Sequence, residues 1–151
     1  MVIGHYYYGK LLSKIISYVE DNNRRYFHSD PDQLEIRSWI DKFLFSDVYV
    51  LGFGYDYAEM DLWWLLNQKK REQLPGMPKT KVYFYEPAGD DKEIKHKLLE
   101  CYDVEVRTLG VKTYAAALAK VDGRLWEENK KMYEEFYYKA LEDMVYRIKL
   151  L

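Results

Sequence analysis

Residues 47–66 constrain the fold of this chain more than any other stretch. They contain the apolar run Val48–Leu51, which is rich in β-branched and aromatic residues, as is typical of a strand buried on both faces of a parallel sheet. Gly52 and Gly54 interrupt this run, and glycine permits positive φ and the close approach of another group to the backbone. The pattern therefore predicts a strand that ends in a glycine turn.

A helix is expected directly after this turn. Asp56 and Glu59 stand at the spacing of an N-cap and an N3 residue, which places the helix start near residue 57. The first two turns are apolar nearly all round, so Trp63 and Trp64 are expected in the core. In open α/β sheets ligands bind beyond the carboxyl ends of the strands. The stretch therefore predicts the position of a ligand site more clearly than the reaction, if any, that the ligand undergoes.

Composition bounds the class of protein. With 151 residues and 17% aromatic residues, the chain is expected to form a single domain, residues 1–151, with its own core. The formal net charge of −2 argues against nucleic-acid binding through bulk positive charge. We expect no membrane span and no signal peptide, since the apolar runs are too short and the first residues lack the required order. The lone Cys101 excludes an internal disulfide, and a cytoplasmic setting is expected.

Periodicity predicts the remaining elements. Helices are expected over residues 4–21, from Pro31 onward, over residues 90–102 and over residues 124–149, with a helical turn at 114–119. The second of these helices should bury a stripe of five apolar side chains: Ile36, Trp39, Ile40, Phe43 and Leu44. Strands are expected at 82–85 and at 104–109, where alternation indicates an edge strand. In the helix over 90–102, the inward residues are expected to be Ile94, Leu98 and Leu99.

The order of these elements predicts an α/β fold. Right-handed crossovers place three parallel strands side by side with helices on both faces, a three-layer half-Rossmann arrangement that ends in a long C-terminal helix. Val48–Leu51 then lies at or near an edge of the sheet, where an apolar strand invites pairing. Either the first helices cover this edge, or a partner strand is missing from the chain.

Four segments resemble the bacterial sirtuin-like (silent-information-regulator-like) family, in the divergent branch found in many phage-defence proteins. They are Val50-Leu-Gly-Phe-Gly-Tyr, Glu59-Met-Asp-Leu-Trp-Trp-Leu-Leu-Asn, Val82-Tyr-Phe-Tyr-Glu-Pro and the opening Ile3-Gly-His-Tyr-Tyr-Tyr-Gly-Lys-Leu-Leu. The resemblance covers residues 3–110, and more loosely the last helix. It is most specific between Gly52 and Asn67.

The resemblance implies a Rossmann-like domain that binds NAD, whose active members hydrolyse NAD or deacylate lysines. The family's glycine-rich loop and its catalytic asparagine and histidine precede the part seen here, so the chain is similar to a C-terminal half alone. The implied nucleotide-contacting residues are the turn and its surroundings, namely Gly52, Phe53, Gly54, Tyr55, Asp61, Glu86 and Gly110. Glu86 falls near the family's adenosine-contacting position, where the usual asparagine is absent.

Simpler readings of several residues stay open. The glycines do not complete G-x-G-x-x-G and could serve only as a tight turn. Glu59 and Asp61 do not share a helix face and suit the helix dipole better than acid–base chemistry, although Asp61 could fix the shape of the glycine turn. The three histidines are scattered, and the basic run that begins at Lys69 is expected to be a solvated helix end.

Two functions of different classes follow. In the first, the chain is an NAD-binding half-domain related to NAD hydrolases of phage defence and inactive alone, with catalytic groups from a complementary N-terminal half. In the second, it is a non-enzymatic assembly module, which acts through the apolar sheet edge and the final helix, with a homo-oligomer among the possible products. No residue is predicted to be catalytic or to bind a metal.

Overall fold

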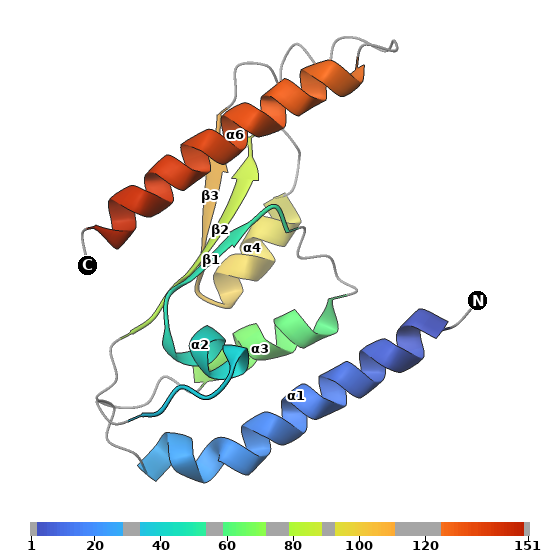
Figure 1. Cartoon of the computed structure of the whole chain (residues 1–151), viewed down its shortest axis with the longest axis vertical. Helices are drawn as coiled ribbons and strands as arrows, with labels where there is room; N and C mark the ends of the chain where they lie inside the picture. Colours follow the sequence, from blue (N-terminus) through green and yellow to red (C-terminus); the bar gives the residue numbers. More distant parts are fainter. Residues whose placement is uncertain are drawn as a thin grey trace. The chain divides into compact units, whose positions relative to one another are not determined.

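The computed structural model describes residues 3–28, 34–53, 59–71, 79–88, 93–110 and 125–149 (Figure 1). The chain divides into two compact units. The helical unit comprises residues 1–47 and 54–80, and the sheet unit comprises residues 48–53 and 81–151. The expectation of a single domain stays a prediction.

The sheet unit is built on three parallel strands, β1 (Val48–Leu51), β2 (Val82–Pro87) and β3 (Val104–Leu109), in the order β1-β2-β3. This arrangement confirms the expected α/β fold and the parallel pairing of its strands. The central strand β2 is buried from Val82 to Glu86, whereas β1 is only half-buried along its length. The expectation that β1 is buried on both faces is therefore wrong, because an edge strand has a neighbour on one side only.

Helices cover the two faces of this sheet. Alternate residues of a strand point to opposite faces, so Tyr83 and Tyr85 face one helix while Phe84 and Glu86 face another. The long α6 (Leu125–Ile148) crosses all three strands on the tyrosine face (Figure 1). Its buried residues recur every fourth position: Met132, Phe136, Ala140 and Met144. The predicted final helix and the three-layer arrangement are confirmed.

The second helix of the sheet unit, α4 (Glu93–Cys101), packs on the opposite face against β3. Leu99 is fully buried and Leu98 is half-buried, as expected, but Ile94 is 79% exposed. A short helix against an edge strand buries only a narrow strip, and Ile94 lies outside the strip that contains Leu99. Cys101 is exposed at the end of the helix. The turn expected at 114–119 lies outside the described residues.

The helical unit contains α1 (Ile3–His28), α2 (Trp39–Phe45) and α3 (Met60–Arg71). The first helix was expected to end at residue 21, but it continues for two further turns. Arg25 and Tyr26 explain the extension, because both side chains bind the buried carboxylate of Asp41 on α2. A tertiary contact therefore stabilises a polar segment that would not be helical by its periodicity.

Asp41 of α2 is fully buried in the helical unit. Its carboxylate accepts hydrogen bonds from five donor groups: Tyr26 Oη (2.6 Å), Arg37 N (2.8 Å), Tyr18 Oη (2.9 Å), Arg25 Nη2 (3.0 Å to each oxygen) and Ser38 N (3.2 Å). Burial by itself would raise the pKa of Asp41, but these hydrogen bonds outweigh it and hold the pKa below the ordinary value. Asp41 thus joins α1 to the start of α2.

The start of α2 differs from the prediction. Ser38 is the N-cap and forms a capping box with Asp41, so the helix begins at Trp39, and Pro31 lies outside the described residues. Ile40, Phe43 and Leu44 are buried as expected. Ile36 and Trp39 are 41% and 53% exposed, so their assignment to the buried stripe is wrong. Ile36 precedes the helix, which removes it from the helical periodicity.

The third helix begins at Met60 rather than near residue 57. The carbonyl of Glu59 accepts the backbone N–H groups of Leu62 and Trp63, so Glu59 precedes the helix instead of occupying its first turn. Asp56 lies outside the described residues. Leu65 and Leu66 are fully buried, whereas Trp63 and Trp64 are half-buried and do not form the core that was expected.

Lys69 contradicts the expectation of a solvated helix end. Its side chain is 5% exposed, and its ammonium group donates to the carbonyl oxygens of Phe43 (2.9 Å), Leu44 (3.1 Å) and Ser46 (2.8 Å) and to Thr80 Oγ1 (2.7 Å). These carbonyls end α2, where the helix dipole favours a cation. Burial lowers the pKa of Lys69 to about 8. Lys69 therefore caps α2 from α3.

Candidate functional site

The carboxyl ends of the three parallel strands form the candidate site of the sheet unit. The register pairs Leu51 with Tyr85 and Tyr85 with Arg107, so the strands end side by side. The predicted residues Gly52 and Glu86 stand at this level, and Gly110 follows the end of β3. The topology therefore gathers Gly52, Phe53, Glu86 and Gly110 at one edge of the sheet.

Gly52 adopts the left-handed backbone conformation, with φ of 71°. A Cβ at this position would lie 2.9 Å from Tyr137 Oη of α6, closer than real Cβ contacts. The backbone angle therefore favours glycine, and any larger residue would also displace the end of the Tyr137 side chain. The next residue, Phe53, is 39% exposed. The strand thus ends in a turn that leaves backbone and an aromatic ring accessible, with Tyr137 beside it.

The carboxylate of Glu86 does not point into solvent. The residue is 5% exposed, and one carboxylate oxygen contacts His96 Nε2 while the other lies 3.8 Å from Lys95 Nζ. Lys95 also lies over the ring of Phe84, 4.4 Å from its centroid. At this position the more exposed group is the imidazole of His96, with 22% of its side chain accessible against 7% for Glu86.

Sequence reasoning did not find the His96–Glu86 pair, because it treated the histidines as scattered. One signal was present in the helix periodicity. Lys95 and His96 stand four and three residues before the buried Leu99 and therefore share its face of α4. Because α4 packs on the sheet, this face lies against the strand that contains Glu86, β2.

Gly110 lies at the end of β3 and is exposed. Its carbonyl accepts a hydrogen bond of 2.7 Å from Lys139 Nζ of α6, and Lys139 also forms a 2.7 Å ion pair with Glu135. Cationic side chains thus stand near the ends of two strands, Lys95 at β2 and Lys139 at β3.

The other predicted site residues are placed differently. Asp61 lies half-buried in the first turn of α3 and belongs to the helical unit. Its role in fixing the glycine turn stays a prediction. Gly54 and Tyr55 lie outside the described residues. Within the described ranges, no three His, Cys, Asp or Glu side chains gather as a metal site would require.

A second polar cluster lies between the sheet and α6. Tyr85 Oη donates to Asp143 (2.7 Å), and Arg147 Nε donates to the same oxygen (2.8 Å). Arg147 also lies over the ring of Tyr83, 5.1 Å from its centroid. Burial and the bond to Asp143 raise the pKa of Tyr85, while the bonds from Arg147 and Tyr85 outweigh burial and lower the pKa of Asp143. These contacts hold α6 against the sheet.

The site can hold an anionic ligand group more readily than it can carry out acid–base chemistry. The exposed backbone at Gly52 suits a phosphate, and the Phe53 ring suits an aromatic base. The Glu86 carboxylate does not fit direct contact with a ribose hydroxyl, since His96 and Lys95 already engage it. The geometry therefore fits a nucleotide at the turn and not at Glu86.

The fold and site define a three-layer α/β unit with a glycine turn at the carboxyl edge of a parallel sheet. None of the described helices has the length and apolar character needed to cross a membrane. Comparison with protein-family models, with curated proteins and with solved structures found no match.

Proposed function

We propose that this chain is a sirtuin-like half-domain that binds a nucleotide, NAD in the first instance, at the carboxyl edge of its parallel sheet. The observation that carries the proposal is Gly52, whose positive φ ends β1 where open α/β sheets bind ligands. Helix α3 follows this strand in the chain, so the strand–glycine turn–helix order expected from the sequence is present.

In this proposal the backbone of Gly52 and Phe53 contacts the nucleotide, and the Phe53 ring packs on its base. His96 presents its imidazole at the end of β2, held in place by Glu86. Glu86 thus orients a neighbouring group instead of contacting the adenosine itself. This assignment differs from the direct contact that the resemblance implies.

NAD consumption would require catalytic groups from a complementary N-terminal half, as in the NAD hydrolases of phage defence. We therefore expect the chain alone to bind NAD or ADP-ribose without consuming it. When bound, NAD would supply the labile nicotinamide–ribose bond, and the residues of this chain would position the adenosine side of the molecule.

Calorimetric titration of the purified chain with NAD and with ADP-ribose tests the proposal. The substitution Phe53→Ala should weaken binding about fivefold or more, because base–aromatic stacking contributes on the order of 1–3 kcal/mol. Ile94→Ala is the matched control, since it removes an exposed apolar side chain on α4. Absence of heat with either ligand up to millimolar concentration would refute the proposal, and chromatography of the same mixtures reports any loss of NAD.

The second candidate function is a non-enzymatic assembly module. Two observations favour it: β1 pairs only with β2 among the described strands, and α6 exposes large apolar side chains. A chain that binds no nucleotide but forms a defined complex would support this function in place of the first.

A further inference from the structure

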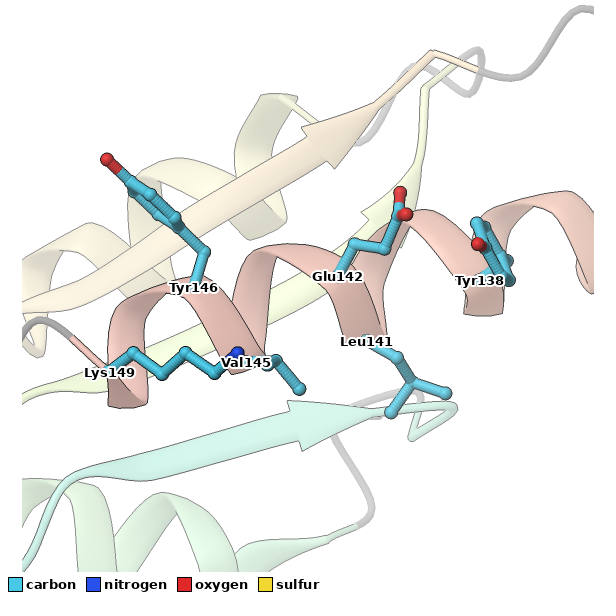
Figure 2. Close-up of a pocket in the computed structure, with 6 residues that line it drawn as sticks. All are labelled: Tyr138, Leu141, Glu142, Val145, Tyr146 and Lys149. Atoms are coloured by element: carbon cyan, nitrogen blue, oxygen red, sulfur yellow. The ribbon is translucent and has the colours of Figure 1, made fainter.

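Helix α6 carries an apolar surface on the side away from the sheet. Large apolar residues there are substantially exposed, and we name them the outer face of α6: Tyr138 (66%), Leu141 (54%), Val145 (49%), Tyr146 (64%) and Ile148 (57%). Figure 2 shows Tyr138, Leu141, Val145 and Tyr146 around a shallow pocket, together with Glu142 and Lys149, and all six rise from this one helix. Because the core residues of α6 use its other side, the helix is apolar over more of its circumference than the sheet requires.

The spacing of the outer face is that of helix pairing. Tyr138, Leu141, Val145 and Ile148 follow one another at intervals of three, four and three residues. This is the spacing of the a and d positions of a heptad, whose side chains pack between two helices. The outer face extends over eleven residues, from Tyr138 to Ile148, which is about three turns of helix.

Charge indicates which helix is the partner. Glu134 lies before the outer face and Lys149 at its end, and both are exposed. If two copies of α6 ran antiparallel, with Tyr138 against Ile148 and Leu141 against Val145, Lys149 of one copy would lie within one helical turn of Glu134 of the other. A parallel pair would instead bring like charges together at both ends, whereas the antiparallel pair brings like charges together only near its centre, where Glu142 of one copy lies close to Glu142 of the other. The antiparallel pair also opposes the two helix dipoles.

The exposed area is of the size that such a pair needs. Tyr138 and Tyr146 of the outer face are 66% and 64% exposed, and at ~200 Å² for each side chain they present on the order of 260 Å². Leu141, Val145 and Ile148 add to this area. A standard interface buries about 800 Å² on each partner, so α6 supplies most of one.

We propose that this chain forms a homodimer in which the outer faces of two α6 helices pair antiparallel. The interface uses side chains distant from the Gly52 turn in the sequence and does not depend on nucleotide binding. It gives the assembly function a defined partner, a second copy of the chain.

Sedimentation velocity over a concentration series tests this pairing, with a reductant present because Cys101 is exposed. The wild-type chain should shift from monomer to dimer as its concentration rises. Leu141→Glu should raise the dimer dissociation constant at least about tenfold, since it places a charge in the centre of the interface. Ile94→Glu is the matched control, because it makes the same kind of change on the exposed side of α4 and should leave the dimer intact.

A charge exchange tests the antiparallel direction. Glu134→Lys and Lys149→Glu should each weaken the dimer, and the double variant should restore it. At a protein concentration where the wild type is monomeric, thermal melts of all variants should match the wild type, because these side chains are exposed in the monomer. A monomer at every concentration, or a dimer unaffected by Leu141→Glu, would overturn the proposal. Failure of the double variant to restore the dimer would overturn the antiparallel pairing.

Discussion

Replacement of Lys69 by methionine tests whether the buried ammonium group of this residue caps α2. The ammonium group of Lys69 donates to the carbonyl oxygens of Phe43, Leu44 and Ser46 at 2.8–3.1 Å and to Thr80 Oγ1 at 2.7 Å. Methionine keeps most of the side-chain volume but supplies no donor. The variant therefore leaves the carbonyl end of α2 without its cap.

The magnitude follows from two opposing contributions. Three carbonyl oxygens each lose a charge-assisted hydrogen bond worth about 1.5–3 kcal/mol. Against this, the variant no longer buries a charge, and the lowering of the Lys69 pKa from 10.5 to about 8 corresponds to a burial cost of roughly 3 kcal/mol at pH 7. The net expectation is a loss of about 3 kcal/mol in the free energy of unfolding at pH 7.

The pH dependence gives an independent check. The folded pKa of Lys69, about 8, lies below its ordinary value of 10.5, so the native state binds fewer protons than the unfolded state between these pH values. The contribution of Lys69 to wild-type stability should therefore rise by about 2 kcal/mol from pH 7 to pH 9.5. Lys69→Met should lack this rise.

Urea unfolding followed by tryptophan fluorescence provides the assay, because Trp39, Trp63 and Trp64 all belong to the helical unit. The neighbouring Lys70→Met is the control: Lys70 is exposed, so its replacement should change stability by less than about 0.5 kcal/mol. Equal stabilities for Lys69→Met and Lys70→Met at pH 7, or a wild-type stability that does not rise above pH 7, would show that Lys69 does not cap α2 as a buried cation.

Three further predictions concern other parts of the chain. Gly52→Ala should destabilise the sheet unit by about 2 kcal/mol, because of the positive φ at this position and the close approach to Tyr137. In a double-mutant cycle measured by urea unfolding, Tyr137→Ala should remove the part of this loss that comes from the steric contact and leave the part that comes from the positive φ. Asp41→Asn should cost about 3 kcal/mol or more of unfolding free energy at pH 7. Because the folded pKa of Asp41 lies below its ordinary value of 3.8, wild-type stability should fall as the pH falls through that range, and the variant should lack this pH dependence. Acid titration followed by circular dichroism measures the difference. Tyr85→Phe should cost about 1 kcal/mol and Asp143→Ala more, since the latter leaves the buried Tyr85 hydroxyl without its acceptor; similar losses in chemical unfolding would contradict this ranking.

The sequence alone determined the features that depend on local pattern. The apolar run Val48–Leu51, its end at Gly52 and the long final helix all follow from side-chain periodicity and from the conformational freedom of glycine. The parallel order of the strands follows as well, because each crossover is long enough to contain a helix. The common edge of Gly52, Glu86 and Gly110 is a consequence of that topology.

The pairings of charged groups depend on the tertiary structure. Lys69 is buried because α2 ends beside it, Asp41 because two turns of α1 return to it, and Glu86 because His96 reaches it from α4. A charged residue has the same local pattern whether it points to water or to a partner distant in the sequence. Its burial depends on whether that partner offsets the loss of solvation, and the partner's position is fixed only when the chain has folded.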